Sequence, residues 1–411
     1  MRFVKESVNT TPIEDTVFAI VKKAKEAKAA IGAEHVVDAT IGSLYNEEGT
    51  IVAYDSVFTP YDHIAKETKA AYAGSFVGND SFRQQVYDWV VKPSGSTLAH
   101  SVIATPGGTG AVSVTVNEIL DEGETLIIPE IAWGSYKLMA TMANINTKAY
   151  SLFEDDHFNL ASLKETCQEV MKTQKKLLLI INDPCHNPTG YSLSVAEWEA
   201  VVAFLNECAK QVPVVLLNDI AYMDYAYQLD TSRAYIKTFD AFSENVMTVI
   251  AFSCSKSLTS YGLRCGAAIL LAKTQEAVRS VEIVFEKAAR ATWSNIPNAA
   301  MDNFTYVTST NIDAYLKEKA YYIDLLNERS SIFTKEADAC GLSYYPYKEG
   351  FFVTVKMEDN AIRDAFHEAL MAQHVYTVKV NKGIRVAVCS LSTAKTKGLA
   401  KRMKDILESI A

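Results

Sequence analysis

The sequence lacks the features that mark membrane, secreted and metal-binding chains. No run approaches the roughly 18 consecutive apolar residues of a membrane-spanning helix. The first residues, Met1 to Glu6, lack the apolar core of a signal peptide, so we expect a cytoplasmic protein with no membrane partner. The seven cysteines are odd in number and include no Cys-x-x-Cys pair. This pattern indicates buried, reduced thiols, and we assign no metal ligands.

Positive charge is also scarce. The 40 lysines and arginines are outnumbered by 49 acidic residues, which gives a net charge of −9. An acidic surface argues against nucleic acid and anionic membranes as partners, although a few arginines in a pocket can still bind an anionic substrate. The chain is 411 residues long and 49% hydrophobic, enough for a large core. This length predicts two domains, or one large domain with a smaller one beside it.

Short apolar runs alternate with helical stretches through the middle of the chain. We predict strands at Val102–Ala104, Thr125–Ile128, Leu177–Ile181, Val214–Leu217, Met247–Phe252 and Ala267–Leu271. Helical periodicity appears between several of them, at Gly110–Leu120, Ser135–Met142, Leu160–Met171 and Val195–Lys210. Most of the strands are unbroken apolar runs, as expected when both faces of a sheet are covered. The alternation predicts an α/β domain with a mostly parallel sheet flanked by helices.

The C-terminal part has a different pattern. A long helical stretch, about Ile312–Cys340, leads into predicted strands and helices at Phe351–Val355, Ala361–Gln373, Val375–Val378 and Ile384–Val388, and a last helix follows. We interpret this part as a smaller α+β domain, and we place the N-terminal helix near Val17–Ala30 with it. The predicted division is a large domain at 46–311 and a small domain made of 1–45 and 312–411.

In parallel α/β sheets, ligands gather at the carboxyl ends of the strands, and five polar or aromatic clusters in this chain follow predicted strands. Thr105-Pro-Gly-Gly-Thr-Gly110 opens a helix, where backbone N–H groups and the helix dipole can hold an anion. A tight structural turn is the alternative for this segment. Trp133 could stack on a planar ring, although a lone tryptophan is more often part of a core.

The next two clusters contain amides, a histidine and an acid. In the loop from Asn182 to Gly190, Asn187 suits a hydrogen bond to a neutral or phenolate oxygen. His186 is isolated, and we interpret it as structural rather than as a catalytic base. Asp219 ends a buried strand, where a carboxylate is costly unless it meets a positive partner. A functional and a structural role both stay open for Asp219.

Lys256 is the most unusual of these residues. It follows the apolar strand Met247–Phe252 and the hydroxyls of Ser253 and Ser255, and Arg264 comes eight residues later. A desolvated lysine has a lowered pKa and can form a Schiff base, whereas a surface lysine is the ordinary interpretation of this cluster alone. Together the five clusters hold what pyridoxal 5′-phosphate (PLP) needs: an amine, an acid for the pyridinium nitrogen, an aromatic stacker and phosphate donors.

Several motifs that appear in order carry a resemblance to a known family. They are Pro106-Gly-Gly-Thr-Gly-Ala111, His186-Asn-Pro-Thr-Gly190, Asp219-x-x-Tyr222, Ser253-x-Ser-Lys256 with Arg264, and Gly383-Ile-Arg385-Val-Ala. Near the start they are joined by Asp38-Ala-Thr-Ile-Gly42 and Tyr45-Asn-Glu-Glu-Gly49. The sequence resembles, over nearly its whole length, the class I aminotransferases of PLP fold type I, in particular the aspartate and aromatic amino acid aminotransferase branch.

The resemblance implies roles for the residues that match the family's cofactor site. Lys256 is expected to bind PLP covalently and, once released, to carry a proton between substrate and cofactor. Asp219 is expected to keep the pyridine nitrogen protonated, and Trp133 to stack on the ring. Tyr222 and Asn187 are expected to hydrogen-bond the phenolic oxygen. The expected phosphate ligands are Gly108, Thr109, Ser253, Ser255, Arg264 and, from the other subunit of a homodimer, Tyr72.

The resemblance also implies how a substrate is held. Arg385 is expected to clamp the α-carboxylate, because its planar guanidinium pairs bidentately with a carboxylate. Gly42 approaches the same carboxylate, and Asn187 and Trp133 line the same space. Arg290 is expected to read a distal carboxylate across the dimer interface, with a solvated arginine at a helix end as the alternative. Aspartate, glutamate or aromatic amino acids, with 2-oxo acids, are then the expected substrates, and closure of the small domain expels water.

We therefore expect a homodimeric aminotransferase with shared active sites and a ping-pong mechanism. The alternative is a different fold type I reaction on an amino acid, such as β-elimination or β-decarboxylation, which would use the same lysine and acid. A PLP-binding regulator without turnover is a third interpretation, but the chain reaches Gly42 too soon for a DNA-binding domain. A generic α/β binding protein without PLP leaves the five clusters unexplained.

Overall fold

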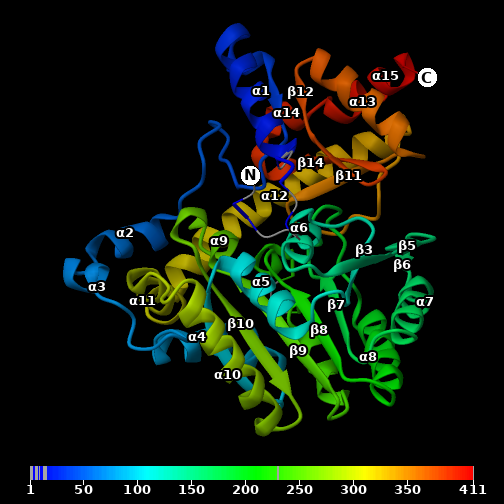
Figure 1. Cartoon of the computed structure of the whole chain (residues 1–411). Helices are drawn as coiled ribbons and strands as arrows, with labels where there is room; N and C mark the ends of the chain where they lie inside the picture. The colour runs from blue at the N-terminus through cyan, green and yellow to red at the C-terminus, as the bar shows by residue number, and fades with distance from the viewer. Residues whose placement is uncertain (1–2, 5–7, 9, 13–15, 229–230, 411) are drawn as a thin grey trace.

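The computed structural model describes the chain except residues 1–2, 5–7, 9, 13–15, 229–230 and 411 (Figure 1). Its larger part is built on a seven-stranded sheet with the order β2-β10-β9-β8-β7-β3-β4. The strands are β2 (Ala99–Pro106), β3 (Thr125–Pro129), β4 (Asn146–Tyr150), β7 (Leu177–Asn182), β8 (Val214–Asp219), β9 (Val246–Ser253) and β10 (Cys265–Ala272). Neighbours pair in parallel except β10, which is antiparallel to β2 and β9. The predicted mostly parallel α/β sheet is therefore confirmed.

Helices cover both faces of this sheet because its strands are apolar on both sides. Along β7, Leu177, Leu179 and Ile181 face one core, whereas Leu178 and Ile180 face the other. The first core is completed by α4 (Asp80–Val90), α7 (Leu160–Met171), α8 (Val195–Ala209) and α11 (Asn298–Ser309). The second is completed by α5 (Gly107–Ile119), α6 (Ser135–Met142) and α10 (Gln275–Thr292). Shorter elements of this part are α2 (Asp55–His63), α3 (Lys66–Ala70), α9 (Cys254–Ser257), β5 (Phe153–Glu154) and β6 (His157–Phe158).

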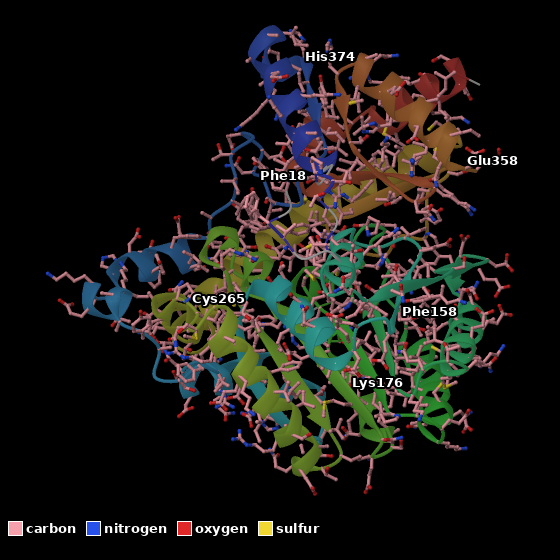
Figure 2. The ribbon with its side chains drawn as sticks, in the orientation of Figure 1. Phe18, Phe158, Lys176, Cys265, Glu358 and His374 are labelled. Atoms are coloured by element: carbon pink, nitrogen blue, oxygen red, sulfur yellow. The ribbon has the colours of Figure 1, made fainter. Side chains whose placement is uncertain are left out.

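The smaller part is built from segments near both ends of the chain, residues 16–38 from the N-terminal side and residues 352–409 from the C-terminal side (Figure 1). Its antiparallel sheet has the order β11 (Phe352–Lys356), β14 (Gly383–Ala387), β13 (Val378–Val380), and β1 (Val37–Asp38) pairs in parallel with β12 (Val375–Tyr376). Around them lie α1 (Thr16–Ile31), α13 (Asn360–Ala372), α14 (Thr393–Thr396) and α15 (Leu399–Ser409). Figure 2 shows Phe18, Glu358 and His374 in this part, and Phe158, Lys176 and Cys265 in the larger one. The long helix α12 (Ile312–Cys340) contacts α2 in the larger part and α15 in the smaller.

Most of the predicted elements are confirmed, and the bounds of α6, α7 and α12 agree with the prediction. The prediction of a single strand at Val375–Val378 is wrong, because β12 ends at Tyr376 and pairs with β1, whereas β13 begins at Val378 and pairs with β14. The edge strand β4 has no predicted counterpart, because most of its residues are polar or partly exposed. None of the described helices is long and apolar enough to cross a bilayer.

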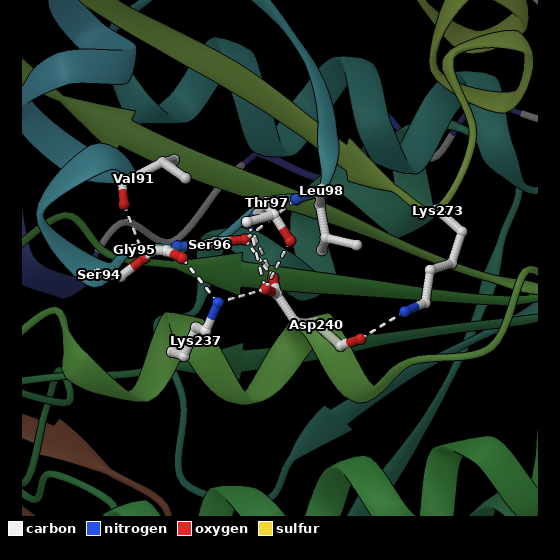
Figure 3. Close-up of polar contacts among 9 residues, drawn as sticks. All are labelled: Val91, Ser94, Gly95, Ser96, Thr97, Leu98, Lys237, Asp240 and Lys273. Atoms are coloured by element: carbon white, nitrogen blue, oxygen red, sulfur yellow. Dashed lines mark hydrogen bonds and ion pairs between the residues drawn. The ribbon is translucent and has the colours of Figure 1, made fainter.

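Asp240 ties together the edge of the large sheet where β2 begins and β10 ends (Figure 3). Its carboxylate accepts hydrogen bonds from the Ser96 hydroxyl at 2.5 Å and the Thr97 N–H at 3.1 Å, and it pairs with Lys237 at 2.7 Å. Its backbone carbonyl accepts a hydrogen bond from Lys273. The polar side chains of the candidate site gather at the opposite end of the sheet, beyond the strand carboxyl ends.

Candidate active site

The carboxyl ends of β7, β8 and β9 and the start of α5 surround one cavity. It is lined by Gly108, Thr109, Trp133, Tyr136, Asn182, Asn187, Asp219, Ala221, Tyr222, Ser253, Ser255, Lys256 and Arg264. All the residues that the sequence assigns to the cofactor are therefore brought together here, except Tyr72.

Lys256 extends into this cavity from α9, the single turn that follows β9. Its Nζ lies 5.2 Å from the centre of the Tyr222 ring, and no carboxylate among the described residues forms an ion pair with it. Burial lowers the pKa of Lys256 to about 8, although the charge of Asp219 opposes this effect. A lysine in this environment is available as a nucleophilic amine near neutral pH.

Asp219 faces the same cavity from the end of β8. Its Oδ1 accepts the Ala221 N–H at 3.0 Å, and its Oδ2 accepts the Tyr136 hydroxyl at 2.6 Å. Burial raises the pKa of Asp219, and these two hydrogen bonds and the charge of Lys256 oppose the rise. No cation contacts the carboxylate among the described residues, so it can accept a further N–H, as a pyridinium nitrogen would provide.

Donors for an anion gather at the N-terminus of α5. Gly108 and Thr109 lie in its first turn, where backbone N–H groups have no partner within the helix. Arg264 reaches the same place and donates to Ser255 Oγ at 3.1 Å. Gly107 has a φ of +69°, which favours glycine, and a Cβ there would lie 2.5 Å from Arg264 Nη2, so a side chain would displace the guanidinium. A helix N-terminus, hydroxyl groups and a guanidinium together fit a phosphate group.

Arg385 lies on β14 beside the cavity and joins the two parts of the chain. It donates to Thr40 O at 2.8 Å and to Asn187 Oδ1 at 3.2 Å, and its guanidinium stacks 4.4 Å from the centre of the Phe352 ring. Its Nε is buried without a hydrogen-bond partner among the described residues. Gly42 packs at the same place, since a Cβ there would lie 2.9 Å from the Phe352 ring. A guanidinium with an unused N–H suits a carboxylate ligand.

Two aromatic residues complete the cavity wall. Trp133 is partly buried and meets the Tyr136 ring edge to face, with ring centres 5.4 Å apart. Tyr222 is buried, and burial raises its pKa, so its hydroxyl remains a donor at physiological pH. The cavity therefore offers both a stacking surface and a neutral hydroxyl donor, which fits an aromatic ring that carries an oxygen substituent.

Tyr72 and Arg290 do not line the cavity. Tyr72 is 85% exposed. Arg290 is also exposed, with its guanidinium 4.7 Å from the centre of the Phe76 ring and a 2.7 Å hydrogen bond to Ser294 Oγ. The roles assigned to both residues require a second copy of the chain, and they stay predictions.

Comparison with known proteins identifies the family. Residues 36–403 match the family model of the class I and II aminotransferases. The chain belongs to this family. A solved structure of an aminotransferase from Anaerococcus prevotii is 32% identical to it and superposes with a TM-score of 0.95 over 98% of this chain and 99% of that one.

A curated relative matches part of the chain. The aspartate aminotransferase of Salmonella typhi is 25% identical over 195 residues, which are 47% of this chain and 48% of that protein, so the match spans about half the length of the curated relative. An aromatic-amino-acid aminotransferase of Burkholderia pseudomallei, covalently bound to pyridoxal phosphate, shares the fold with a TM-score of 0.78 and 19% identity over 99% and 100% of the two chains. The predicted family and fold are confirmed.

Three residues that line the cavity received no role from the sequence: Tyr136, Asn182 and Ala221. Asn182 joins two neighbouring segments, because it accepts the Asn187 N–H at 2.7 Å and donates to the Asp219 carbonyl at 2.7 Å. Its position at the end of a predicted strand was a usable signal. Tyr136 lies in the first turn of a predicted helix, three residues after Trp133, and nothing in that pattern points to Asp219.

His186 does not line the cavity. It is buried, and burial lowers its pKa to about 3, so it is neutral at physiological pH. Its Nδ1 lies 2.8 Å from Thr189 Oγ1, within its own loop. This environment agrees with the structural interpretation of His186.

Proposed function

We propose that the protein transfers the amino group of an L-amino acid to a 2-oxo acid, with PLP as cofactor and a ping-pong mechanism. The observation that carries this proposal is the amine of Lys256, which has no ion pair with any described residue and shares with Asp219 a cavity that has anion donors at one end. The donor set fits PLP group by group: an amine for its aldehyde, a carboxylate for its ring nitrogen and a helix N-terminus for its phosphate.

The residues of the cavity then have distinct tasks. PLP, when bound, supplies a conjugated ring that takes up the electron pair left at the substrate Cα when its proton is removed. Lys256 would hold the cofactor through its amine and would act as the base that moves this proton. Asp219 would accept the N–H of the ring nitrogen and keep it protonated. Tyr222 and Asn187 would donate hydrogen bonds to the phenolic oxygen.

Arg385 binds the α-carboxylate of the substrate through its guanidinium. Its hydrogen bonds to Thr40 and Asn187 hold the side chain in place and link both parts of the chain to the substrate. We propose that residues 1–45 and 312–411 form the small domain, that residues 46–311 form the large one, and that the small domain closes on the substrate. Closure would exclude water and strengthen the charged contacts inside the cavity.

We propose a homodimer in the cytoplasm in which each chain completes the site of the other. The support is the exposure of Tyr72 and Arg290, which have the residue types for phosphate and carboxylate binding but lie outside their own cavity. Arg290 of one chain would then bind the distal carboxylate of aspartate or glutamate in the other. Aromatic amino acids are the second substrate class, since their side chains need no such partner.

A panel of amino donors with 2-oxoglutarate and oxaloacetate tests the activity and ranks the substrates. Arg290→Ala is expected to lower kcat/KM for dicarboxylic donors by about tenfold to a hundredfold, because a charge-assisted hydrogen bond is lost, and to affect aromatic donors little. Arg279→Ala, in the same helix and also exposed, is the control. Equal losses for both donor classes would remove Arg290 as the selecting residue.

The alternative chemistry is β-elimination or β-decarboxylation at the same lysine. Incubation with an amino donor alone separates the two possibilities. A transaminase changes the absorbance of the bound cofactor stoichiometrically and stops until a 2-oxo acid is added, whereas a lyase or decarboxylase keeps turning over.

A further inference from the structure

The first turn of α6 brings a tyrosine against the acid of the site. Tyr136 is 1% exposed, and its hydroxyl donates to Asp219 Oδ2 at 2.6 Å. This is the only hydrogen bond of the hydroxyl group among the described residues. Both side chains line the cavity that contains Lys256.

The carboxylate of Asp219 is thereby held at both of its oxygens. The Ala221 N–H occupies Oδ1 at 3.0 Å, and the Tyr136 hydroxyl occupies Oδ2. Two donors on different oxygens fix the plane of the carboxylate, which could otherwise rotate about its Cβ–Cγ bond. Each oxygen still has capacity for a second donor, so a ring N–H can bind without displacing either contact.

Tyr136 can act only as a donor in this contact. Burial and the nearby Asp219 raise the pKa of Tyr136 well above 10, so the hydroxyl keeps its proton. Its hydrogen bond favours the ionised form of Asp219, whereas burial favours the neutral form. Tyr136 therefore opposes the effect of burial at the one carboxylate in the cavity.

We propose that Tyr136 is a positioning residue whose hydroxyl holds the Asp219 carboxylate toward the ring nitrogen of the cofactor. The inference rests on the proposed function, because the ring nitrogen is that of PLP. Without the hydroxyl, only one oxygen of Asp219 is held by a hydrogen bond, and the ionised form of the carboxylate is stabilised less. The protonated form of the ring nitrogen is then stabilised less as well.

The competing role for Tyr136 is packing of its ring. The ring meets Trp133 edge to face and belongs to the core beneath α5 and α6. Tyr136→Phe keeps the ring and removes only the hydroxyl. Tyr150→Phe is the matched control, because Tyr150 is also 1% exposed and, among the described residues, its hydroxyl makes one long hydrogen bond, 3.4 Å to Ile180 O, away from the cavity.

The test uses holoenzyme loaded with PLP that carries ¹⁵N at its ring nitrogen. The ¹⁵N resonance of the wild type is expected at the position of a protonated pyridine, and in Tyr136→Phe it should move toward the unprotonated position. The dissociation constant of PLP should rise about tenfold to a hundredfold, as for the loss of a hydrogen bond to a charged group. Tyr150→Phe should match the wild type. An unchanged resonance in folded Tyr136→Phe overturns the inference.

A double variant separates positioning from packing. In the Asp219→Asn background, adding Tyr136→Phe should change neither the resonance nor PLP affinity further, because the group through which Tyr136 acts is gone. Equal losses in both backgrounds would assign Tyr136 to packing. Should Tyr136→Phe not fold, 3-fluorotyrosine at position 136 keeps the ring and strengthens the donor. It should lower the dissociation constant of PLP, and no change or a rise would contradict the inference.

The two proposals fail in different ways. A wild-type protein that binds no PLP would refute the proposed function itself. A wild-type protein that binds PLP with a protonated ring nitrogen, and a Tyr136→Phe variant that does the same, would refute only the role of Tyr136.

Discussion

Two lysine–aspartate pairs of this fold consist of the same residue types, but the pKa of the aspartate is shifted in opposite directions in the two pairs. In the cavity, Lys256 faces Asp219 without forming an ion pair with it. A second pair is fully buried: Lys319 Nζ lies 3.2 Å from Asp224 Oδ1, and Arg233 Nη2 lies 2.7 Å from the same oxygen.

The surroundings explain the difference. Two cations hold the pKa of Asp224 well below its ordinary value, whereas burial raises that of Asp219. Lys319 also packs on the rings of Trp89 and Tyr315, at 4.9 and 5.0 Å. The Asp224 cluster is thus internally satisfied, and the cavity pair keeps capacity for a ligand. A buried charge without a close partner therefore marks a ligand-binding site better than a buried ion pair does.

The second pair also supports the first. Tyr315, which packs on Lys319, donates its hydroxyl to the Ser257 carbonyl at 2.7 Å, at the end of α9. Tyr225 donates to the Lys256 carbonyl at 3.1 Å in the same turn. The satisfied cluster therefore lies behind the turn that presents the reactive amine.

The largest expected effect comes from removing the unpaired amine. Lys256→Ala should lower transamination by several orders of magnitude, because both the covalent anchor and the base are lost. Initial rates with amino donor and 2-oxo acid measure this. Lys317→Ala, an exposed lysine on α12, is the control and should leave the rate unchanged. Full turnover of Lys256→Ala would contradict the proposed mechanism.

The next largest effect should be a difference in the free energy of unfolding between variants of Asp224 and of Asp219. Asp224→Asn leaves Lys319 and Arg233 buried without their anion, and it should lower the free energy of unfolding by about 3–5 kcal/mol. Asp219→Asn removes a carboxylate that burial disfavours, and it should change stability by less than about 1 kcal/mol while abolishing most activity. Urea denaturation of both apoproteins gives the comparison, and equal losses would erase the distinction between the pairs.

A smaller effect should appear in the pH dependence of stability. Burial lowers the pKa of Lys256 to about 8 from an ordinary value of 10.5, so its charged form costs stability in the fold. Below pH 8 the cost is fully present, and it disappears as the pH rises toward 10.5, where both states lose the proton. The Lys256→Met apoprotein should therefore be more stable than the wild-type apoprotein at pH 7, by on the order of 2 kcal/mol. A pH-independent difference would contradict this account.

The smallest effect should come from the paired lysine. Lys319→Met leaves the neutral pair of Asp224 and Arg233, so stability should change by less than about 1 kcal/mol. Thermal unfolding measures it. A loss as large as that of Asp224→Asn would mean that Lys319, rather than the aspartate, holds the cluster together.

The sequence was sufficient to identify the site residues that follow parallel strands, because parallel strands have their carboxyl ends at the same edge of the sheet. Lys256, Asp219 and Asn187 were found in this way. Position at the strand end alone could not separate Asp219 from Asp224, because Asp219 ends β8 and Asp224 comes only five residues later; the motif Asp219-x-x-Tyr222 made that assignment. The cations that satisfy Asp224 come from positions 9 and 95 residues away, and only the packing of α12 brings Lys319 to it.

Tyr72 and Arg290 show a second limit of what the sequence and a single chain reveal about the site. Motif spacing assigns them to the site, yet a single chain leaves both exposed and outside the cavity. Tyr136 marks a third, because a hydroxyl that reaches from α6 to the end of β8 depends on how the helix packs on the sheet.

Borohydride reduction of the PLP-loaded protein tests the central claim most directly, because it fixes the cofactor to the lysine that holds it. Proteolysis and mass spectrometry then locate the pyridoxyl group. The account predicts a single modified lysine, Lys256, and unmodified Lys319. Modification of Lys319 or another lysine, or no modification after PLP binding, would contradict it.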